Sequence, residues 1–370
     1  MVQKVAIIGG GIVGSTVAYY LSKNDFKNYD VSLFDEGVGQ ATKAAAGIIS
    51  PWLSKRRNKK WYHLASSGAK LVAQIADETK MDSEVYSNDG TIITRKNQDS
   101  LNELYQIALE RKKTSPQIGD VRYVSNSEIK DLIPIINNSP YDGLFVPGGS
   151  RIDGYLYTQH LLKLAQNRNL HIYKGHADLK KANQIIFNGE KLNFDKIILA
   201  TGAWSKNILA DLNINLKLRP QKGQLIEIKV PDIKSNENMP VMMPESEYDF
   251  IPLGNGKLII GATHDNDHGF DLKSEKSVNQ KLVKTADNLI SKISVDDIIL
   301  SKVGTRAYTD DFSPFFGYVP GTNQSLLIGT GLGSSGLTTG PMVAKLLIDL
   351  IKNPEIDLSE YQKPISNYIN

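Results

Sequence analysis

The sequence predicts an α/β protein (α+β at the level of two domains) in which a Rossmann-like nucleotide-binding domain is interleaved with an antiparallel-sheet domain. The first observation is the apolar run Val5–Ile8, whose length and β-branching are typical of a buried parallel strand. The second is the G-x-G-x-x-G motif of Gly9, Gly11 and Gly14, directly after that run. The third is the period-2 alternation within residues 225–262, which is typical of antiparallel strands with one buried face.

The glycine motif predicts a dinucleotide site where the first strand meets the first helix. Gly9 permits a tight turn, Gly11 leaves space for phosphates, and Gly14 lets the helix pack closely on the strand. The N-terminus of that helix attracts a pyrophosphate. A second strand ends in Asp35, about 20 residues beyond Gly14, where an acid accepts hydrogen bonds from a ribose. An acid there disfavours an NADP-type ligand, so FAD and NAD remain as alternatives.

The length and composition of the chain exclude several classes of protein. Its 370 residues are too many for one ordinary core and suit two domains. The hydrophobic content of 41%, the charged content of 22% and the net charge of +3 are typical of a soluble globular enzyme, and they indicate neither nucleic acid nor an anionic membrane as partner. The absence of cysteine excludes disulfides, thiolate metal sites, cysteine nucleophiles and a cysteinyl bond to a cofactor.

The sequence also carries expectations about where the protein resides. The nucleotide-binding fold begins at Lys4, and no run of about 18 apolar residues occurs. We therefore expect a cytoplasmic protein without a membrane span. Whether the chain forms a homo-oligomer stays open.

Two segments after Asp35 are candidates for ligand contacts. Small residues dominate residues 37–50, and small side chains allow a ligand to approach the backbone; a small-residue helix packed on the sheet is the alternative. The basic run Lys55–Lys60 lies between Trp52 and Trp61. A solvated charged face is the commoner interpretation of such a run, and attraction of an anionic substrate or a phosphate is the alternative.

The middle of the chain contains short strands and polar loops. Residues 171–175, 184–188 and 192–194 are predicted to form one small meander, which leads into the strand and turn A-T-G-A-W-S at residues 200–205. The segment His264–His268 contains metal-ligand residue types. No stiff helix fixes their geometry, so a polar loop explains them better, and we expect no metal site.

Taken in order, these motifs resemble those of the FAD-dependent glycine oxidase, sarcosine oxidase and D-amino-acid oxidase (DAO) superfamily. The shared features begin with G-x-G-x-x-G, the acid after the second strand, and T-x-A-A-A-G-I at residues 42–48. They continue with A-T-G-A-W-S, with R-P-Q-K-G-Q at residues 219–224, and with residues 303–317. The last segment is the most specific match. Its Arg306 aligns with the family's carboxylate-binding arginine, although Ala307 replaces the motif's proline.

The resemblance implies an FAD-dependent enzyme with non-covalently bound FAD. It would oxidise the C–N bond of an amino acid or N-substituted amino acid (of glycine, D-amino acid or sarcosine type) by hydride transfer to flavin N5, and the imino acid product would hydrolyse. Oxygen or another electron acceptor would reoxidise the flavin. A flavin-dependent amino-acid dehydrogenase, a nicotinamide-dependent dehydrogenase and a non-catalytic flavin-binding protein stay open as alternatives.

The resemblance also implies particular site residues. Arg306 would bind the substrate carboxylate, with a structural ion pair as its alternative role. Tyr248 and Phe250 are candidates for an aromatic residue beside the substrate, but the register is open, because counting back from Pro252 puts Asp249 at the position where the family usually has tyrosine. The residues expected to bind FAD are Gly9, Gly11, Ile12, Val13, Gly14, Asp35, Glu36, Thr42, Lys43, Ala45, Ala46, Gly47, Ile48, Ala177, Thr201, Gly202, Trp204, Arg306, Gly331, Gly333, Ser334, Ser335, Gly336 and Leu337.

The implied FAD-binding domain is discontinuous and covers residues 1–80, 145–218 and 300–370. The substrate domain would then cover residues 81–144 and 219–299. A glycine-rich turn at residues 331–336 precedes a C-terminal helix, whose dipole would stabilise negative charge on the reduced flavin. Leu332 and Ser334 stand where glycine oxidase-like members often have histidine and arginine, so glycine or sarcosine specificity does not follow.

Overall fold

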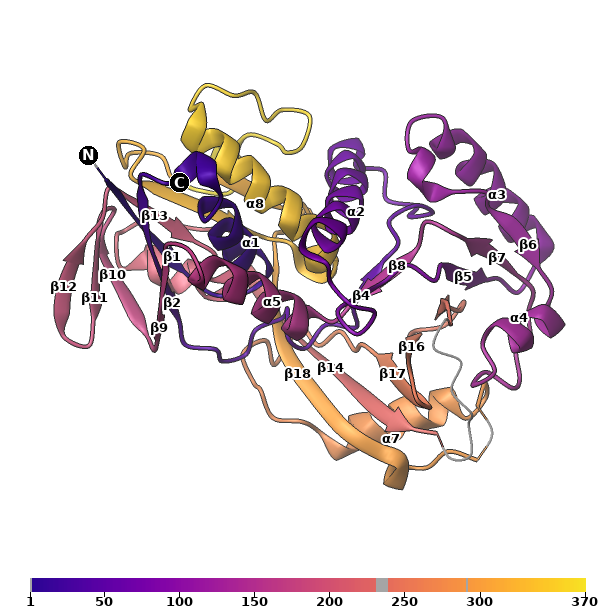
Figure 1. The fold of residues 1–370 in the computed structure, drawn as a ribbon. Coiled ribbons are helices and arrows are strands. Elements are labelled where there is room, and N and C mark those ends of the chain that lie inside the picture. Colours follow the sequence, from indigo (N-terminus) through magenta and orange to yellow (C-terminus); the bar gives the residue numbers. More distant parts are fainter. Residues whose placement is uncertain (1, 231–238, 291) are drawn as a thin grey trace.

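The computed structural model describes residues 2–230, 239–290 and 292–370. The helices of these residues are α1 (Ile12–Leu21), α2 (Lys59–Thr79), α3 (Gln98–Lys112), α4 (Asn126–Leu132), α5 (Gly154–Gln166), α6 (Ser205–Ala210), α7 (Lys276–Ala286) and α8 (Gly336–Lys352). Over the described ranges, no helix combines the length and the apolar character needed to cross a membrane. The predicted α/β class with two sheet-based domains is confirmed (Figure 1).

A six-stranded sheet forms the nucleotide-binding half of the molecule. Its strands in spatial order are β19 (Phe315–Tyr318), β20 (Leu326–Thr330), β13 (Lys196–Leu199), β1 (Gln3–Ile8), β2 (Tyr29–Asp35) and β9 (Leu170–Lys174). All neighbours pair in parallel except β19, which runs antiparallel to β20. Parallel strands bring their carboxyl ends to one edge, which is where ligands bind in such sheets.

Both faces of this sheet are covered, as a continuous apolar strand such as β1 requires. Val5 and Ile7 point into a core shared with α1, α5 and α8, which lie together in Figure 1. Ala6 and Ile8 point into a second core that includes residues of a three-stranded antiparallel sheet. That sheet consists of β10 (Ala177–Lys181), β11 (Gln184–Phe187) and β12 (Glu190–Asn193).

The prediction that residues 171–175 belong to the small meander is wrong. They form β9, which pairs in parallel with β2 at the edge of the six-stranded sheet, and the unpredicted β10 takes their place in the meander. The physical reason is the connection: β9 follows α5, and a strand that follows a crossover helix joins a parallel sheet. Spacing alone does not identify a short strand's partner.

An eight-stranded sheet forms the second half. Its order is β18 (Ile298–Tyr308), β14 (Arg219–Lys229), β17 (Lys257–Gly261), β16 (Asp249–Gly254), β15 (Val241–Met243), β5 (Thr91–Thr94), β7 (Gly143–Val146) and β6 (Arg122–Val124). A small sheet of β3 (Ile48–Ile49), β8 (Ser150–Ile152) and β4 (Tyr86–Ser87) lies between the halves in sequence. Residues 300–308, which we expected within the FAD-binding domain, pair with β14 in the eight-stranded sheet.

The two faces of the eight-stranded sheet differ. One face packs on α7 and on the segment after β6, and its core contains Phe250 of β16 and Tyr248, which directly precedes that strand. On the other face, Ile251 and Ile259 pack with Ala46 and Ile48 of the nucleotide-binding half. The second face therefore meets the carboxyl edge of the six-stranded sheet, and the candidate site lies between them.

Gly68 offers a test of how α2 holds α8 and the loop before it. A Cβ at Gly68 would lie 2.0 Å from the backbone oxygen of Thr338 in α8. Alanine normally favours a helix by up to about 1 kcal/mol over glycine, but here we expect Gly68→Ala to lower the free energy of unfolding by about 1–3 kcal/mol, because the backbones must separate. Urea denaturation measures this. The exposed Lys70→Ala in the same helix is the control, and a Gly68→Ala protein as stable as wild type would contradict the packing.

Candidate functional site

One cavity of about 1070 Å³ runs from the carboxyl edge of the six-stranded sheet to the inner face of the eight-stranded sheet. Cavities that enclose a drug-sized ligand are commonly 300–1,000 Å³. Residues from both halves of the chain line it, including Asp35 at one end and Arg306 at the other. The cavity is therefore long enough to hold an extended dinucleotide together with a small substrate.

The first end of the cavity is built from the glycine motif. Gly9 has a φ of +101°, and a Cβ there would lie 2.5 Å from the carbonyl oxygen of Ala200. A Cβ at Gly14 would lie 1.8 Å from the carbonyl oxygen of Gly9, so the helix packs on the turn only as glycine permits. The hydroxyl of Thr42 accepts a hydrogen bond from the Ile12 N–H at 3.0 Å and thereby caps the start of α1.

Asp35 lies where the end of β2 meets this turn. Its Oδ1 accepts hydrogen bonds from the Gly10 N–H at 3.0 Å and from Nε2 of Gln40 at 2.6 Å. Nζ of Lys43 is 4.0 Å from the other carboxylate oxygen. These contacts fix the carboxylate at the cavity wall, where a ribose hydroxyl can donate to it.

The middle of the cavity is the place where β18 crosses the segment after Asp35. The Thr305 N–H donates to the carbonyl oxygen of Gly39 at 3.0 Å, and a Cβ at Gly304 would lie 2.8 Å from the Ala44 Cβ. Two buried side-chain oxygens beside this crossing, Gln40 Oε1 and Thr305 Oγ1, have no hydrogen-bond partner among the described residues. Both residues line the cavity. Buried oxygens of this kind are satisfied when a ligand donates to them.

Arg306 forms the reactive end. Its guanidinium lies over Gly223 of β14, where a Cβ would be 2.7 Å from Cζ, so the absence of a side chain at Gly223 makes room for it. Nη1 donates to Oε1 of Gln221 at 3.1 Å and to the carbonyl oxygen of Thr263 at 2.8 Å. Burial lowers the pKa of Arg306, and no carboxylate of the described residues pairs with it. Because these hydrogen-bond partners are uncharged, the positive charge of Arg306 remains available to an anionic ligand.

Two further ionisable groups line the cavity beyond Arg306. Burial raises the pKa of Asp249 to about 7. Burial and the charge of Arg306 lower the pKa of His264, so this imidazole is neutral at neutral pH. Glu247 also lines the cavity and is ion-paired with Lys281 at 2.8 Å.

The expected positions of Tyr248 and Phe250 beside the substrate are corrected by the structure. Both side chains are buried in the core on the opposite side of the eight-stranded sheet, and neither lines the cavity. Asp249 between them lines it instead. Successive residues of a strand point to opposite faces, so a shift of one residue exchanges the aromatic pair for the carboxylate.

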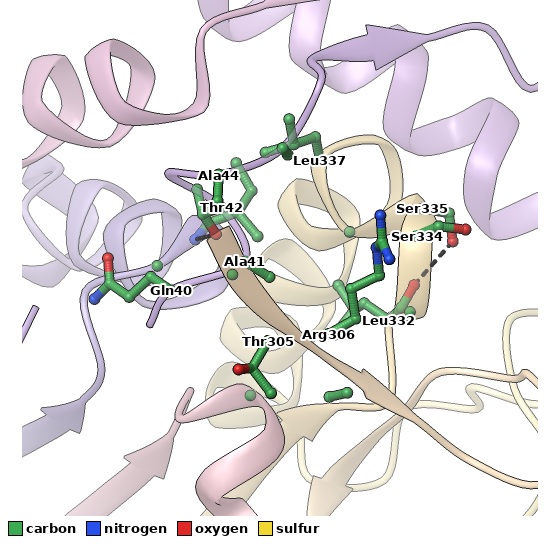
Figure 2. A pocket seen from close by; sticks show the side chains of 18 of the residues that line it. Gln40, Ala41, Thr42, Ala44, Thr305, Arg306, Leu332, Ser334, Ser335 and Leu337 are labelled. Carbon is green, nitrogen blue, oxygen red and sulfur yellow. Dashed lines mark hydrogen bonds between the residues drawn. The ribbon is translucent and has the colours of Figure 1, made fainter. Parts of the chain in front are cut away.

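The loop before α8 closes the reactive end. Figure 2 shows the Arg306 side chain extending from β18 toward the loop that carries Leu332, Ser334 and Ser335. The Ser334 N–H donates to the Tyr308 hydroxyl at 3.1 Å. The indole N–H of Trp61 donates to the Ser335 hydroxyl at 3.2 Å. The loop is thus held by side chains from both β18 and α2.

Most of the expected cofactor residues line this cavity. They are Gly9, Gly11, Ile12, Val13, Asp35, Glu36, Thr42, Ala45, Ala46, Gly47, Ile48, Ala177, Thr201, Gly202, Trp204, Arg306, Gly333, Ser334, Ser335, Gly336 and Leu337. Three do not. Gly14 lies behind the turn, Lys43 lies on the outer side of Asp35, and Gly331 packs against Thr309.

Sequence reasoning missed Arg56, Trp61, Gly223, Asp249 and His264, all of which line the cavity. The basic run between two tryptophans carried a signal for Arg56 and Trp61, because attraction of an anionic substrate was one of its two interpretations. The alternation of side chains along β16 carried a signal for Asp249. The sequence carried no signal that His264 and Gly223 would line this cavity, because their positions depend on which strands become neighbours.

Comparison with known proteins agrees with this geometry. The model of the FAD dependent oxidoreductase family (DAO) matches residues 4–350. An uncharacterized oxidoreductase of Bacillus subtilis, YurR, is 34% identical, over 96% of this chain and 97% of its own. Glycine oxidase of the same organism is 24% identical, over 96% and 94%. The crystal structure of iminodiacetate oxidase from Chelativorans sp. superposes with a TM-score of 0.87 at 28% identity and covers 98% of both chains.

FAD, the cofactor of the matched family, fits the residues present. The glycine turn leaves the space that a pyrophosphate needs at the start of α1, and Asp35 is placed for the adenine ribose. In the middle of the cavity, the side-chain oxygens of Gln40 and Thr305 are buried hydrogen-bond acceptors without a partner among the described residues. Because the chain contains no cysteine, no cysteinyl bond attaches the flavin.

Asp249→Asn should remove a pH dependence of stability. The folded protein keeps the Asp249 proton until about pH 7, whereas the unfolded chain releases it near pH 4. Between these values the unfolded chain binds fewer protons, so stability falls as pH rises, and it stays lower above pH 7. We therefore expect the melting temperature of Asp249→Asn, relative to wild type, to increase from pH 5 to pH 8.

The neighbouring Glu247→Gln is the control for this experiment, because its melting-temperature difference from wild type should stay constant from pH 5 to pH 8 and change only at lower pH. The hydrogen bond from Lys281 lowers the pKa of Glu247, so its ionised form stabilises the fold above the unfolded pKa, and the stabilisation is lost as pH falls through the lower folded pKa. Differential scanning fluorimetry across pH reports both variants. A melting-temperature difference for Asp249→Asn that stays constant across this pH range would show that Asp249 does not titrate as argued.

Proposed function

This chain belongs to the family of FAD-dependent oxidoreductases, and from that premise we propose that it oxidises the carbon–nitrogen bond of an amino acid or an N-substituted amino acid. The observation that carries the proposal is the buried Arg306 guanidinium, which has no carboxylate partner among the described residues and lines the same cavity as the nucleotide-binding turn. The printed names of the relatives, glycine oxidase and iminodiacetate oxidase, describe the same class of substrate.

Arg306 binds and orients the substrate in this proposal. Gln221 and the Thr263 carbonyl oxygen hold one terminal nitrogen of the guanidinium, which leaves the rest of the planar fork for a carboxylate. A two-point contact fixes the carbon next to the carboxylate in one position, and this removes much of the entropic cost of the reaction. When bound, FAD supplies the hydride acceptor.

Asp249 and His264 contribute the remaining polarity. The Asp249 carboxylate offers an acceptor for the substrate's amino group, and its pKa near 7 means that both protonation states are populated at neutral pH. His264, whose pKa is lowered, is a neutral hydrogen-bonding group that adds no charge beside Arg306. Ile48, Met243 and Ala262 line the same region and exclude water from it.

An anaerobic screen of amino acids and N-methylated amino acids tests the proposal directly. Purified protein should show the visible flavin bands, and at least one compound of the panel should bleach them. Admission of oxygen then separates an oxidase, in which the colour returns with peroxide, from a dehydrogenase, which needs another acceptor. Protein without flavin bands, or flavin that no compound bleaches, would refute the proposed function.

Gly223→Ala should impair substrate binding without removing FAD. The added Cβ would occupy the position of the Arg306 guanidinium, a flexible group that moves more easily than backbone. Loss of a charge-assisted contact of about 1.5–3 kcal/mol should lower kcat/KM by about 10- to 100-fold, mainly through KM. Arg306→Ala should have at least the same effect.

The exposed Lys229→Ala, near the far end of the same strand, is the matched control and should leave kcat/KM unchanged. Flavin content and steady-state kinetics are measured for all three variants. Unchanged kinetics in Gly223→Ala or Arg306→Ala would remove Arg306 from the substrate site.

A further inference from the structure

Arg56 brings a guanidinium to the cavity in addition to that of Arg306. Lys55 and Arg95 line the cavity as well, but Lys55 is paired with Glu103, and Arg95 donates to the carbonyl oxygen of Thr94. Arg56 belongs to the basic run Lys55–Lys60. Its Cζ lies 4.4 Å from the ring centre of Trp61, so the guanidinium stacks on the indole. Burial lowers the pKa of Arg56, and its side chain has no hydrogen bond or ion pair among the described residues. Its neighbour Arg57 is exposed and does not line the cavity.

Short contacts connect Arg56 with β18, the strand that carries Arg306. Trp61, on which Arg56 stacks, donates to Ser335 at 3.2 Å. The adjacent residue Ser334 donates to Tyr308 at 3.1 Å. Tyr308 lies two residues beyond Arg306 on β18, which corresponds to about 7 Å along a strand. Burial lowers the pKa of each arginine, and the charge of the same Tyr308 acts on both in the opposite direction.

The two positive charges are not balanced by nearby carboxylates. Two carboxylates, Glu247 and Asp249, line the same cavity, but Glu247 is paired with Lys281, and burial raises the pKa of Asp249 to about 7. A buried cation without a partner is unfavourable, and an anionic ligand offsets this. A substrate with one carboxylate compensates only one of the two groups.

We propose that the substrate is an amine with two carboxylates, one on each substituent of the nitrogen, and that Arg306 binds one carboxylate while Arg56 binds the other. This inference rests on the proposed function, since it names the substrate class of that same site. The chemical class is an N-(carboxyalkyl) amino acid. Arg56 is then the residue that distinguishes a dicarboxylate from a monocarboxylate of the same amine.

The reaction on such a substrate is balanced. The C–H bond next to the nitrogen breaks, its electron pair leaves with the hydrogen to the bound oxidised flavin, and loss of the N–H proton gives a C=N bond. Water then adds to the C=N bond, and the C–N bond cleaves. The products are an oxo acid, a primary amino acid and the two-electron-reduced flavin.

Matched substrate pairs test this proposal in the FAD-loaded enzyme. Iminodiacetate and N-carboxymethyl-alanine each carry two carboxylates, and sarcosine and N-methylalanine are the same amines with one carboxylate removed. Anaerobic stopped-flow measures flavin reduction by each compound. Wild type should prefer the dicarboxylates by at least about tenfold in kcat/KM, which is the value of one charge-assisted contact.

Arg56→Met keeps the apolar stem on Trp61 but removes the charge. It should lower kcat/KM for the dicarboxylates by at least about tenfold and leave the monocarboxylates within about twofold. Arg56→Lys should restore part of the preference, and the exposed Arg57→Met should change neither substrate. Unchanged flavin content and an unchanged visible spectrum verify that Arg56→Met is folded.

The outcomes separate this inference from the proposed function. Flavin reduction by monocarboxylates without preference for dicarboxylates, or a preference that survives in Arg56→Met, overturns the inference while the oxidation of amino acids stands. Equal losses for both members of a pair in Arg56→Met also overturn it. Failure of every amino acid to reduce the flavin removes the proposed function itself.

Discussion

The crossing of β18 over residues 39–44 is the contact on which the site depends. The Thr305 N–H donates to the Gly39 carbonyl oxygen at 3.0 Å, and the absence of a side chain at Gly304 lets the strand approach Ala44. Because β18 is also an edge strand of the eight-stranded sheet, this contact fixes the substrate-binding sheet against the carboxyl ends of the parallel strands. It is also why Asp35 and Arg306 belong to one cavity.

The charged side chains at the two ends of that cavity differ in their hydrogen-bond and ion-pair partners. At the nucleotide end, Asp35 is held by a backbone N–H and by Gln40, so its position is set by the fold. At the reactive end, Arg306 and Arg56 are partly buried and have no carboxylate partner among the described residues. Low-dielectric surroundings strengthen the attraction of these groups for an anion. In the proposed function, this order of neutral and positive lining residues orients a ligand along the cavity and places a carboxylate at its inner end.

The nucleotide-binding half was largely predictable because its signals are local. Strand, turn and helix are consecutive in the chain, and Gly9, Gly14 and Asp35 each have a role set by backbone geometry that residue type reveals. The substrate half was harder, since Arg56, Gly223 and Asp249 acquire their roles only when distant strands pair. Tyr248 and Phe250 illustrate the limit: the family resemblance implied an aromatic contact with the substrate, whereas both rings lie in the core on the other side of the sheet. Likewise, β9 has the pattern of any short strand, and only its pairing with β2 assigns it to the larger sheet.

A crystal structure of the FAD-loaded protein with acetate bound would test the central claim most directly, since acetate is a carboxylate that the enzyme cannot oxidise at a C–N bond. The adenine ribose should lie on Asp35, the isoalloxazine should lie between residues 45–48 and the loop 332–337, and acetate should lie on Arg306. A flavin bound in the opposite direction, or an Arg306 side chain turned to a protein carboxylate, would contradict the single cavity described above.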